Sequence, residues 1–99
     1  MYRETIVLDS TLDENILCNF KKTAIEYHNN RVGTLKNISE KENVLIFQGE
    51  NENAYEIMSL GSLNLYDNKD FVSNVISWTF EDTECPEDNC NILEAYKCV

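Results

Sequence analysis

Apolar side chains recur at intervals of three and four residues within residues 11–31, and this spacing places them along one face of an α-helix. The stripe consists of Ile16, Phe20, Ala24 and Tyr27, and Leu17 widens it. Asp9, Ser10 or Asp13 is suited to cap the start of this helix, and the pair Asn29-Asn30 to end it. A helix with one apolar face must bury that face, so we expect it to pack on a sheet.

Three stretches around that helix have the composition of β-strands. Residues 4–10 have a β-branched and aliphatic centre, and residues 31–38 and 43–49 are joined by a polar turn. The run from Val44 to Phe47 is apolar without interruption, which is typical of a strand buried on both faces. We therefore expect residues 43–49 to be central in the sheet.

A period-two pattern begins at Asn74. It puts Ile76, Trp78 and Phe80 on one face, which predicts a strand with Trp78 on the core side. Residues 90–99 are expected to pair antiparallel with this strand, and a last helix is the alternative.

Residues 51–68 fit either a helix or, near their end, a strand. We favour a short helix, although the interior Gly61 costs a helix about 1 kcal/mol relative to alanine.

The order of these elements predicts one domain, residues 1–99, of the α+β class. Its sheet is expected to be mainly antiparallel, with one long and one short helix packed on one face. The specific arrangement that we expect is ferredoxin-like, βαββαβ plus a C-terminal strand. With 42% hydrophobic residues, a chain of 99 residues can bury its own core despite a net charge of −10.

The negative charge is concentrated in the second half of the chain. Residues 50–99 hold eleven acidic residues against two lysines, whereas residues 1–49 hold seven acidic residues against six basic ones. Such a field repels phosphate backbones and anionic lipids, so we expect no direct binding to nucleic acid or to a membrane. The same field attracts a basic protein, and carboxylates on a rigid frame can imitate phosphates.

The cysteines and the single histidine offer little for catalysis or metal binding. Cys85, Cys90 and Cys98 do not have the spacing of structural zinc sites, so we expect no metal. We expect free thiols at these residues and at Cys18, and a disulfide between Cys85 and Cys90 is the alternative. His28 follows the predicted helical stripe, where the helix dipole favours its charged form, and we expect it at the surface. No phosphate-binding loop or nucleophile motif is present, so we expect neither a cofactor nor an enzyme.

The first ten residues do not resemble a signal peptide, because Arg3, Glu4 and Asp9 surround a short apolar core. We therefore expect a cytoplasmic protein, in the host cytoplasm if it is phage-encoded.

These observations lead to the hypothesis of a small acidic inhibitor that mimics nucleic acid and blocks a basic protein, such as a nuclease or another nucleic-acid enzyme. Phage-encoded blockers of restriction or CRISPR machinery, and bacterial immunity proteins against nuclease toxins, are similar in size and acidity. The residues expected to bind the partner are Glu50, Glu52, Glu56, Asp67, Asp70, Glu81, Asp82, Glu84, Glu87 and Asp88. The alternative is a non-catalytic regulatory or structural module that forms a homodimer, in which the acids serve solubility only.

Overall fold

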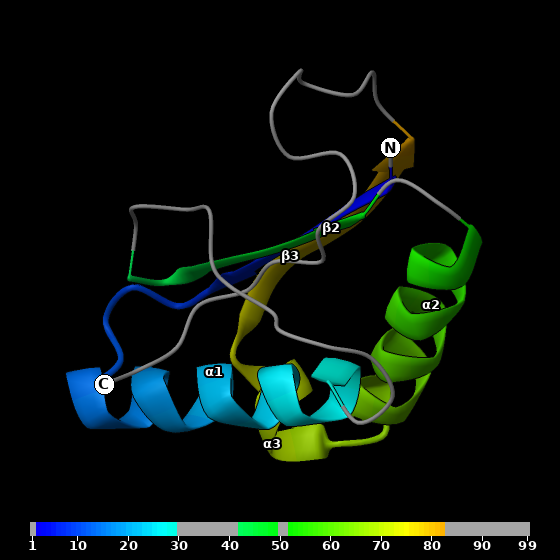
Figure 1. Ribbon diagram of the computed structural model, residues 1–99. Helices are drawn as coiled ribbons and strands as arrows, with labels where there is room; N and C mark the ends of the chain where they lie inside the picture. The colour runs from blue at the N-terminus through cyan, green and yellow to red at the C-terminus, as the bar shows by residue number, and fades with distance from the viewer. Residues whose placement is uncertain (1, 30–41, 50–51, 83–99) are drawn as a thin grey trace.

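Three antiparallel strands form a sheet in the computed structural model, which describes residues 2–29, 42–49 and 52–82 (Figure 1). β1 (Tyr2–Leu8) is the central one of these strands. It pairs with β2 (Val44–Gly49) along one edge and with β3 (Val75–Asp82) along the other.

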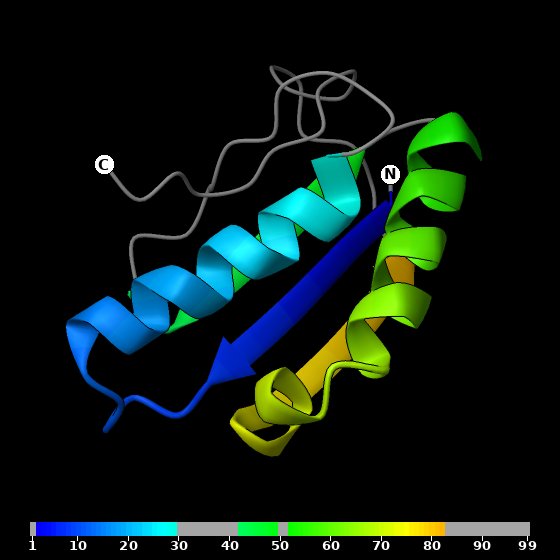
Figure 2. The same cartoon turned by 90° about the horizontal axis from the view of Figure 1, so that it is seen from below.

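The described helices all lie on one face of this sheet (Figures 1 and 2). α1 (Glu14–Asn29) lies over β2, and α2 (Glu52–Tyr66) lies over β3, so that β1 is visible between them in Figure 2. The short α3 (Lys69–Ser73) connects α2 to β3. The chain is therefore a small α+β domain, as its sequence predicts.

Local hydrogen bonds explain where these elements begin. The Asp13 side chain accepts a hydrogen bond from the backbone N of Asn15 at 2.8 Å, so Asp13 caps α1. Asp13 is one of the three residues that the sequence offered as alternatives for this cap. Asp9 instead holds the preceding turn, because it accepts bonds from the hydroxyl and the backbone N of Thr11 at 2.7 and 2.9 Å.

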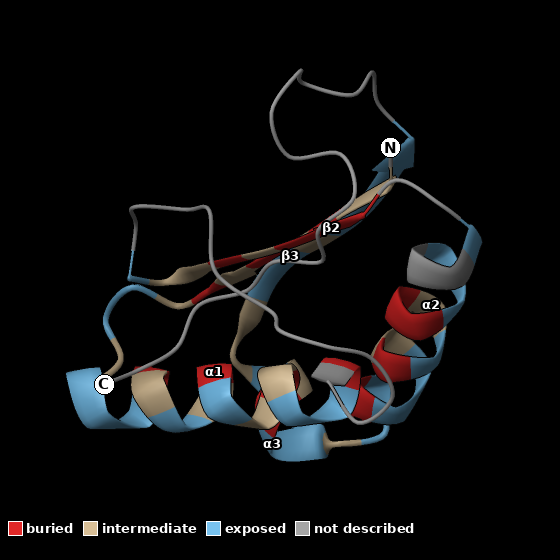
Figure 3. Ribbon diagram, in the orientation of Figure 1, coloured by how far each residue is buried: buried red, intermediate tan, exposed pale blue. Residues whose placement is uncertain are grey.

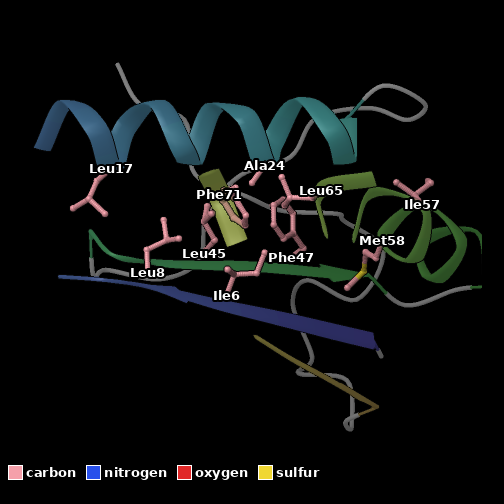
Figure 4. Packing of buried hydrophobic residues seen from close by; sticks show 10 residues of the cluster. All are labelled: Ile6, Leu8, Leu17, Ala24, Leu45, Phe47, Ile57, Met58, Leu65 and Phe71. Carbon is pink, nitrogen blue, oxygen red and sulfur yellow. The ribbon is translucent and has the colours of Figure 1, made fainter. Parts of the chain in front are cut away.

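The core fills the space between the helices and the sheet (Figures 3 and 4). Its buried apolar residues are Ile6, Leu8, Leu17, Ala24, Leu45, Phe47, Ile57, Met58, Leu65 and Phe71. The ring of Phe71 in α3 meets those of Phe20 and Trp78 edge-on, each with a centroid separation of 5.8 Å. α3 therefore closes the core at the end where α1 and α2 diverge.

The buried face of α1 is offset from the predicted stripe. Ile16 and Tyr27, which the sequence places in that stripe, are exposed. The buried positions are Leu17, Lys21, Ala24 and His28. Because two of these four are polar, the periodicity of apolar residues alone does not predict this buried face.

The prediction that residues 43–49 form the central strand is wrong for the described sheet, in which β1 is central. Leu45 and Phe47 are buried under the helices, whereas Val44 and Ile46 are half-buried on the opposite face. The uninterrupted apolar run thus reflects apolar residues on both faces, which a strand beside the centre can also have.

The prediction of a short second helix is also wrong, because α2 has 15 residues against 16 for α1. Gly61 lies inside α2 where a Cβ atom would come within 2.9 Å of the His28 ring. Close packing between the two helices therefore explains a glycine that would otherwise weaken the helix.

The prediction that Trp78 faces the core is confirmed, since Trp78 packs against the core cluster. The alternation breaks before Ser77, where a bulge shifts the register between β1 and β3 and leaves Ile76 66% exposed. Residues 31–38 and 90–99 lie outside the described residues, so the ferredoxin-like arrangement and the C-terminal strand stay predictions.

Candidate functional site

The expected partner-binding acids fall into two groups. Glu50, Glu84, Glu87 and Asp88 lie outside the described residues. The other six are all exposed, and they are Glu52, Glu56, Asp67, Asp70, Glu81 and Asp82.

Four of these six acids stand at the two ends of α2. Glu52 and Glu56 occupy its first two turns, and Asp67 and Asp70 follow its last residue at the corner with α3. A helix of 15 residues is about 22 Å long, so α2 separates the two acidic pairs by roughly that distance.

The end of β3 brings a fifth acid to the same side. The rings of Tyr55 in α2 and Phe80 in β3 are 5.5 Å apart, which places the end of β3 beside the start of α2. Asp82 points to the helix side because it shares the strand face of Phe80. Glu81 points to the opposite side, where its Oε1 atom lies 3.9 Å from Nη1 of Arg3.

Exposed apolar side chains lie among these acids, and they are not among the residues predicted from the sequence. Tyr55 is 44% exposed, Leu63 and Tyr66 are each 67% exposed, and Phe80 of β3 is 42% exposed. We call these four residues the α2 face. The three helical members fall within about a quarter turn of one another. In a helix formed by residues 52–66, apolar residues would lie on both faces. This pattern in the sequence indicates that some of them are exposed.

A network of buried polar groups lies between the helices and β1. Glu4 and His28 are fully buried, and Oε1 of Glu4 is 2.7 Å from Nε2 of His28. The second carboxylate oxygen accepts hydrogen bonds from the Ser62 hydroxyl and, at 2.6 Å, from Nε1 of Trp78. Four elements, β1, α1, α2 and β3, therefore meet at one carboxylate.

The imidazole of His28 is held on both nitrogens and on one face. Nδ1 donates to the carbonyl oxygen of Ala24 at 2.7 Å, and Nε2 faces Glu4. The ring stacks on Phe47 with a centroid separation of 3.9 Å and an interplanar angle of 6°. The expectation of a surface His28 is therefore wrong. The buried carboxylate from β1 is a hydrogen-bonding partner that offsets the free-energy cost of burying the imidazole.

This network contains Ser, His and Glu, yet its geometry is structural. In nucleophilic catalysis the imidazole takes the proton of the hydroxyl. Here Ser62 donates to Glu4 and also lies 2.7 Å from the Met58 carbonyl oxygen, while both imidazole nitrogens are engaged elsewhere. The carboxylate, and not the imidazole, is the shared centre.

Two further polar groups have shifted pKa values. Burial lowers the pKa of Lys21, and the charge of Glu42 opposes that shift. The hydrogen bonds from the Thr11 hydroxyl and backbone N lower the pKa of Asp9. Both groups lie away from the α2 face.

Cys18 in α1 is disulfide-bonded, so the expectation of a free thiol is wrong for this residue. Cys85, Cys90 and Cys98 lie outside the described residues. Within residues 2–29, 42–49 and 52–82, no group of three or more His, Cys, Asp or Glu side chains is placed to hold a metal ion. In the same ranges no helix has the length and apolarity needed to cross a membrane.

No family model, curated protein or solved structure matches this chain.

Proposed function

We propose that this chain is a non-catalytic inhibitor that binds a basic protein by presenting negative charge in the place of nucleic acid. The partner class is a nuclease or another nucleic-acid enzyme with a cationic groove. The observation that carries the proposal is the placement of exposed carboxylates at both ends of α2 and at the end of β3, on one side of a packed body.

The spacing of these acids suits such a groove. The core anchors α2 through Ile57, Met58 and Leu65, so its two ends stay a fixed distance apart. That distance, about 22 Å, corresponds to about six phosphate steps along one nucleic-acid strand. Residues 52–82 contain six acidic residues and one lysine, and five of these acids lie on this side, so it attracts cationic surfaces before contact.

The proposal predicts a binding activity that salt weakens. The immobilised protein should capture its partner from the native cytosol at low ionic strength and release it as salt is raised, because screening shortens the reach of exposed charges. The double variant Glu52→Lys/Glu56→Lys should lose this capture.

The matched control is Glu14→Lys/Glu26→Lys on α1, which also reverses one acid in a first turn and one exposed acid further along. It changes the net charge equally and should keep the partner. Capture that survives in both variants, or that is the same at low and high salt, would contradict the proposal.

We propose that this chain acts in the cytoplasm, or in the host cytoplasm if it is phage-encoded. Disulfides are uncommon in a reducing cytosol, so the disulfide at Cys18 counts against this placement, and the redox state of Cys18 in the cell is the test of it. Thiols should be alkylated at the moment of cell lysis and the Cys18 peptide weighed by mass spectrometry. Alkylated Cys18 agrees with the placement, and an oxidised Cys18 contradicts it.

A second function, a module that homodimerises, is favoured by β3. Within the described sheet, β3 pairs only with β1, and most of its side chains are exposed. An exposed edge strand readily pairs with another copy of the same strand. In that case Thr79→Pro should halve the mass measured by light scattering, whereas Glu52→Lys/Glu56→Lys should leave the mass unchanged.

A further inference from the structure

The exposed apolar residues of the α2 face lie inside the frame of acids. Leu63 and Tyr66 are the most exposed large apolar residues of α2. Glu52 and Glu56 precede them on the helix, and Asp67 follows directly. Solubility alone accounts for the acids, but it does not account for two-thirds-exposed Leu and Tyr side chains between them.

Ring contacts hold the aromatic members of this face in place. Tyr55 meets the rings of Tyr2 and Phe80 at centroid separations of 4.9 and 5.5 Å. Tyr66 lies 6.0 Å from the Trp78 ring, and Trp78 is in turn fixed by its hydrogen bond to Glu4. A partner would thus meet aromatic side chains that lose little conformational entropy on binding.

The charge of the face selects the occupant. A second copy of this chain would bring acids against acids, and an uncharged apolar partner would desolvate carboxylates without pairing them. A cationic partner satisfies the carboxylates. Among cations, the arginine side chain also has a planar group that stacks on aromatic rings and pairs with a carboxylate through two N–H groups.

We propose that the α2 face binds an arginine-rich segment of the partner protein, with guanidinium groups that stack on Tyr55 and Tyr66 and pair with Glu52, Glu56 and Asp67. This inference rests on the proposed function and specifies the chemistry of the partner at that same surface. The acids set the rate of encounter, and the apolar residues set the rate of dissociation.

The test compares two probes of equal length and charge, a polyarginine peptide and a polylysine peptide. Their affinities for the full chain are measured by calorimetry at one low salt concentration. We expect polyarginine to bind about five times more tightly, because stacking adds to the charge attraction that both peptides share. Equal affinities would overturn the inference.

The variant Tyr66→Leu removes one ring from an exposed position and keeps the charge unchanged. It should reduce the preference for polyarginine about twofold to threefold and leave the affinity for polylysine unchanged. The matched control is Tyr27→Leu, which removes an exposed tyrosine from α1 and should keep the full preference. A preference that is equal in both variants would overturn the inference.

The variant Glu52→Lys/Glu56→Lys separates this inference from the proposed function. If it weakens both peptides equally and the wild type has no arginine preference, the aromatic contribution fails while the acidic surface stands. If it weakens neither peptide, the proposed function fails as well.

Discussion

Glu4 lies at the centre of a buried polar network. Its two oxygens face His28, Ser62 and Trp78, so a single carboxylate links residues that are 24, 58 and 74 positions away in sequence. Removing one partner of a buried pair leaves the others without a match in a low-dielectric interior. The network therefore specifies how the helices sit on the sheet.

Replacing Glu4 with Gln should lower the free energy of unfolding by about 3 kcal/mol, because one amide oxygen replaces two carboxylate oxygens that contact three side chains. Urea denaturation followed by circular dichroism measures this change. Glu14→Gln, an exposed control on α1, should change stability by less than about 0.5 kcal/mol. An equal, small effect of both variants would show that the network adds no stability.

Replacing Gly61 with alanine has two effects of opposite sign on the stability of the protein. Alanine is favoured over glycine inside a helix by about 1 kcal/mol, but a Cβ atom here would lie 2.9 Å from the His28 ring. The ring is stacked on Phe47 and bonded at both nitrogens, so it cannot move aside easily. We expect Gly61→Ala to destabilise the protein by about 1–3 kcal/mol.

The control for Gly61 is Asn64→Ala, an exposed position on the same helix. Thermal unfolding should show a small gain for Asn64→Ala from helix propensity alone. If Gly61→Ala raised the melting temperature as well, the close approach of α1 and α2 would be wrong.

The lowered pKa of Asp9 predicts a small dependence of folding stability on pH, and its sign can be stated. Its folded-state pKa lies below the ordinary value of 3.8 because the Thr11 hydroxyl and backbone N donate to the carboxylate. The stabilisation is therefore present above pH 3.8 and is lost as the pH falls through the lower, folded-state pKa. Carboxyl NMR titration should show a midpoint below 3.8 that rises in Thr11→Val, and an unchanged midpoint would contradict this account.

At the scale of elements, α3 has only five residues, but it places Phe71 in the core. The side chain of Asn68 accepts a hydrogen bond from the backbone N of Phe71 at 3.1 Å, which caps this helix. Asn68→Ala should therefore cost about 1 kcal/mol in chemical denaturation. Ser73→Ala, which removes an exposed hydroxyl from the same helix, should cost less than half as much. Equal costs would mean that the cap does not hold Phe71.

Most elements could be predicted because their patterns are local. The presence of α1, its Asp13 cap and the Trp78 strand all follow from neighbouring residues. The buried polar face of α1 could not be predicted, since it depends on Glu4 meeting His28 across 24 residues. The pairing order could not be predicted either, since it joins β1 to strands that lie far from it in the sequence. The sequence predicted the exposed acids of α2 and β3 but not the α2 face, because apolar residues occur on both sides of segment 52–66 and packing on the sheet decides which side is buried.

Across the molecule, the described helices share one side of the sheet with five of the six described candidate acids, and Glu81 lies on the other side. α2 carries its buried residues toward β1 and its exposed residues outward, with acids at both ends. A cationic partner would therefore bind at α2 and β3 and would not contact α1.

The most direct measurement of this account is an NMR map of backbone amide shifts in the full chain during titration with polyarginine. We expect shifts that concentrate in α2 and at the end of β3, and that shrink as salt is added. Shifts that concentrate in α1, or that do not respond to salt, would contradict it.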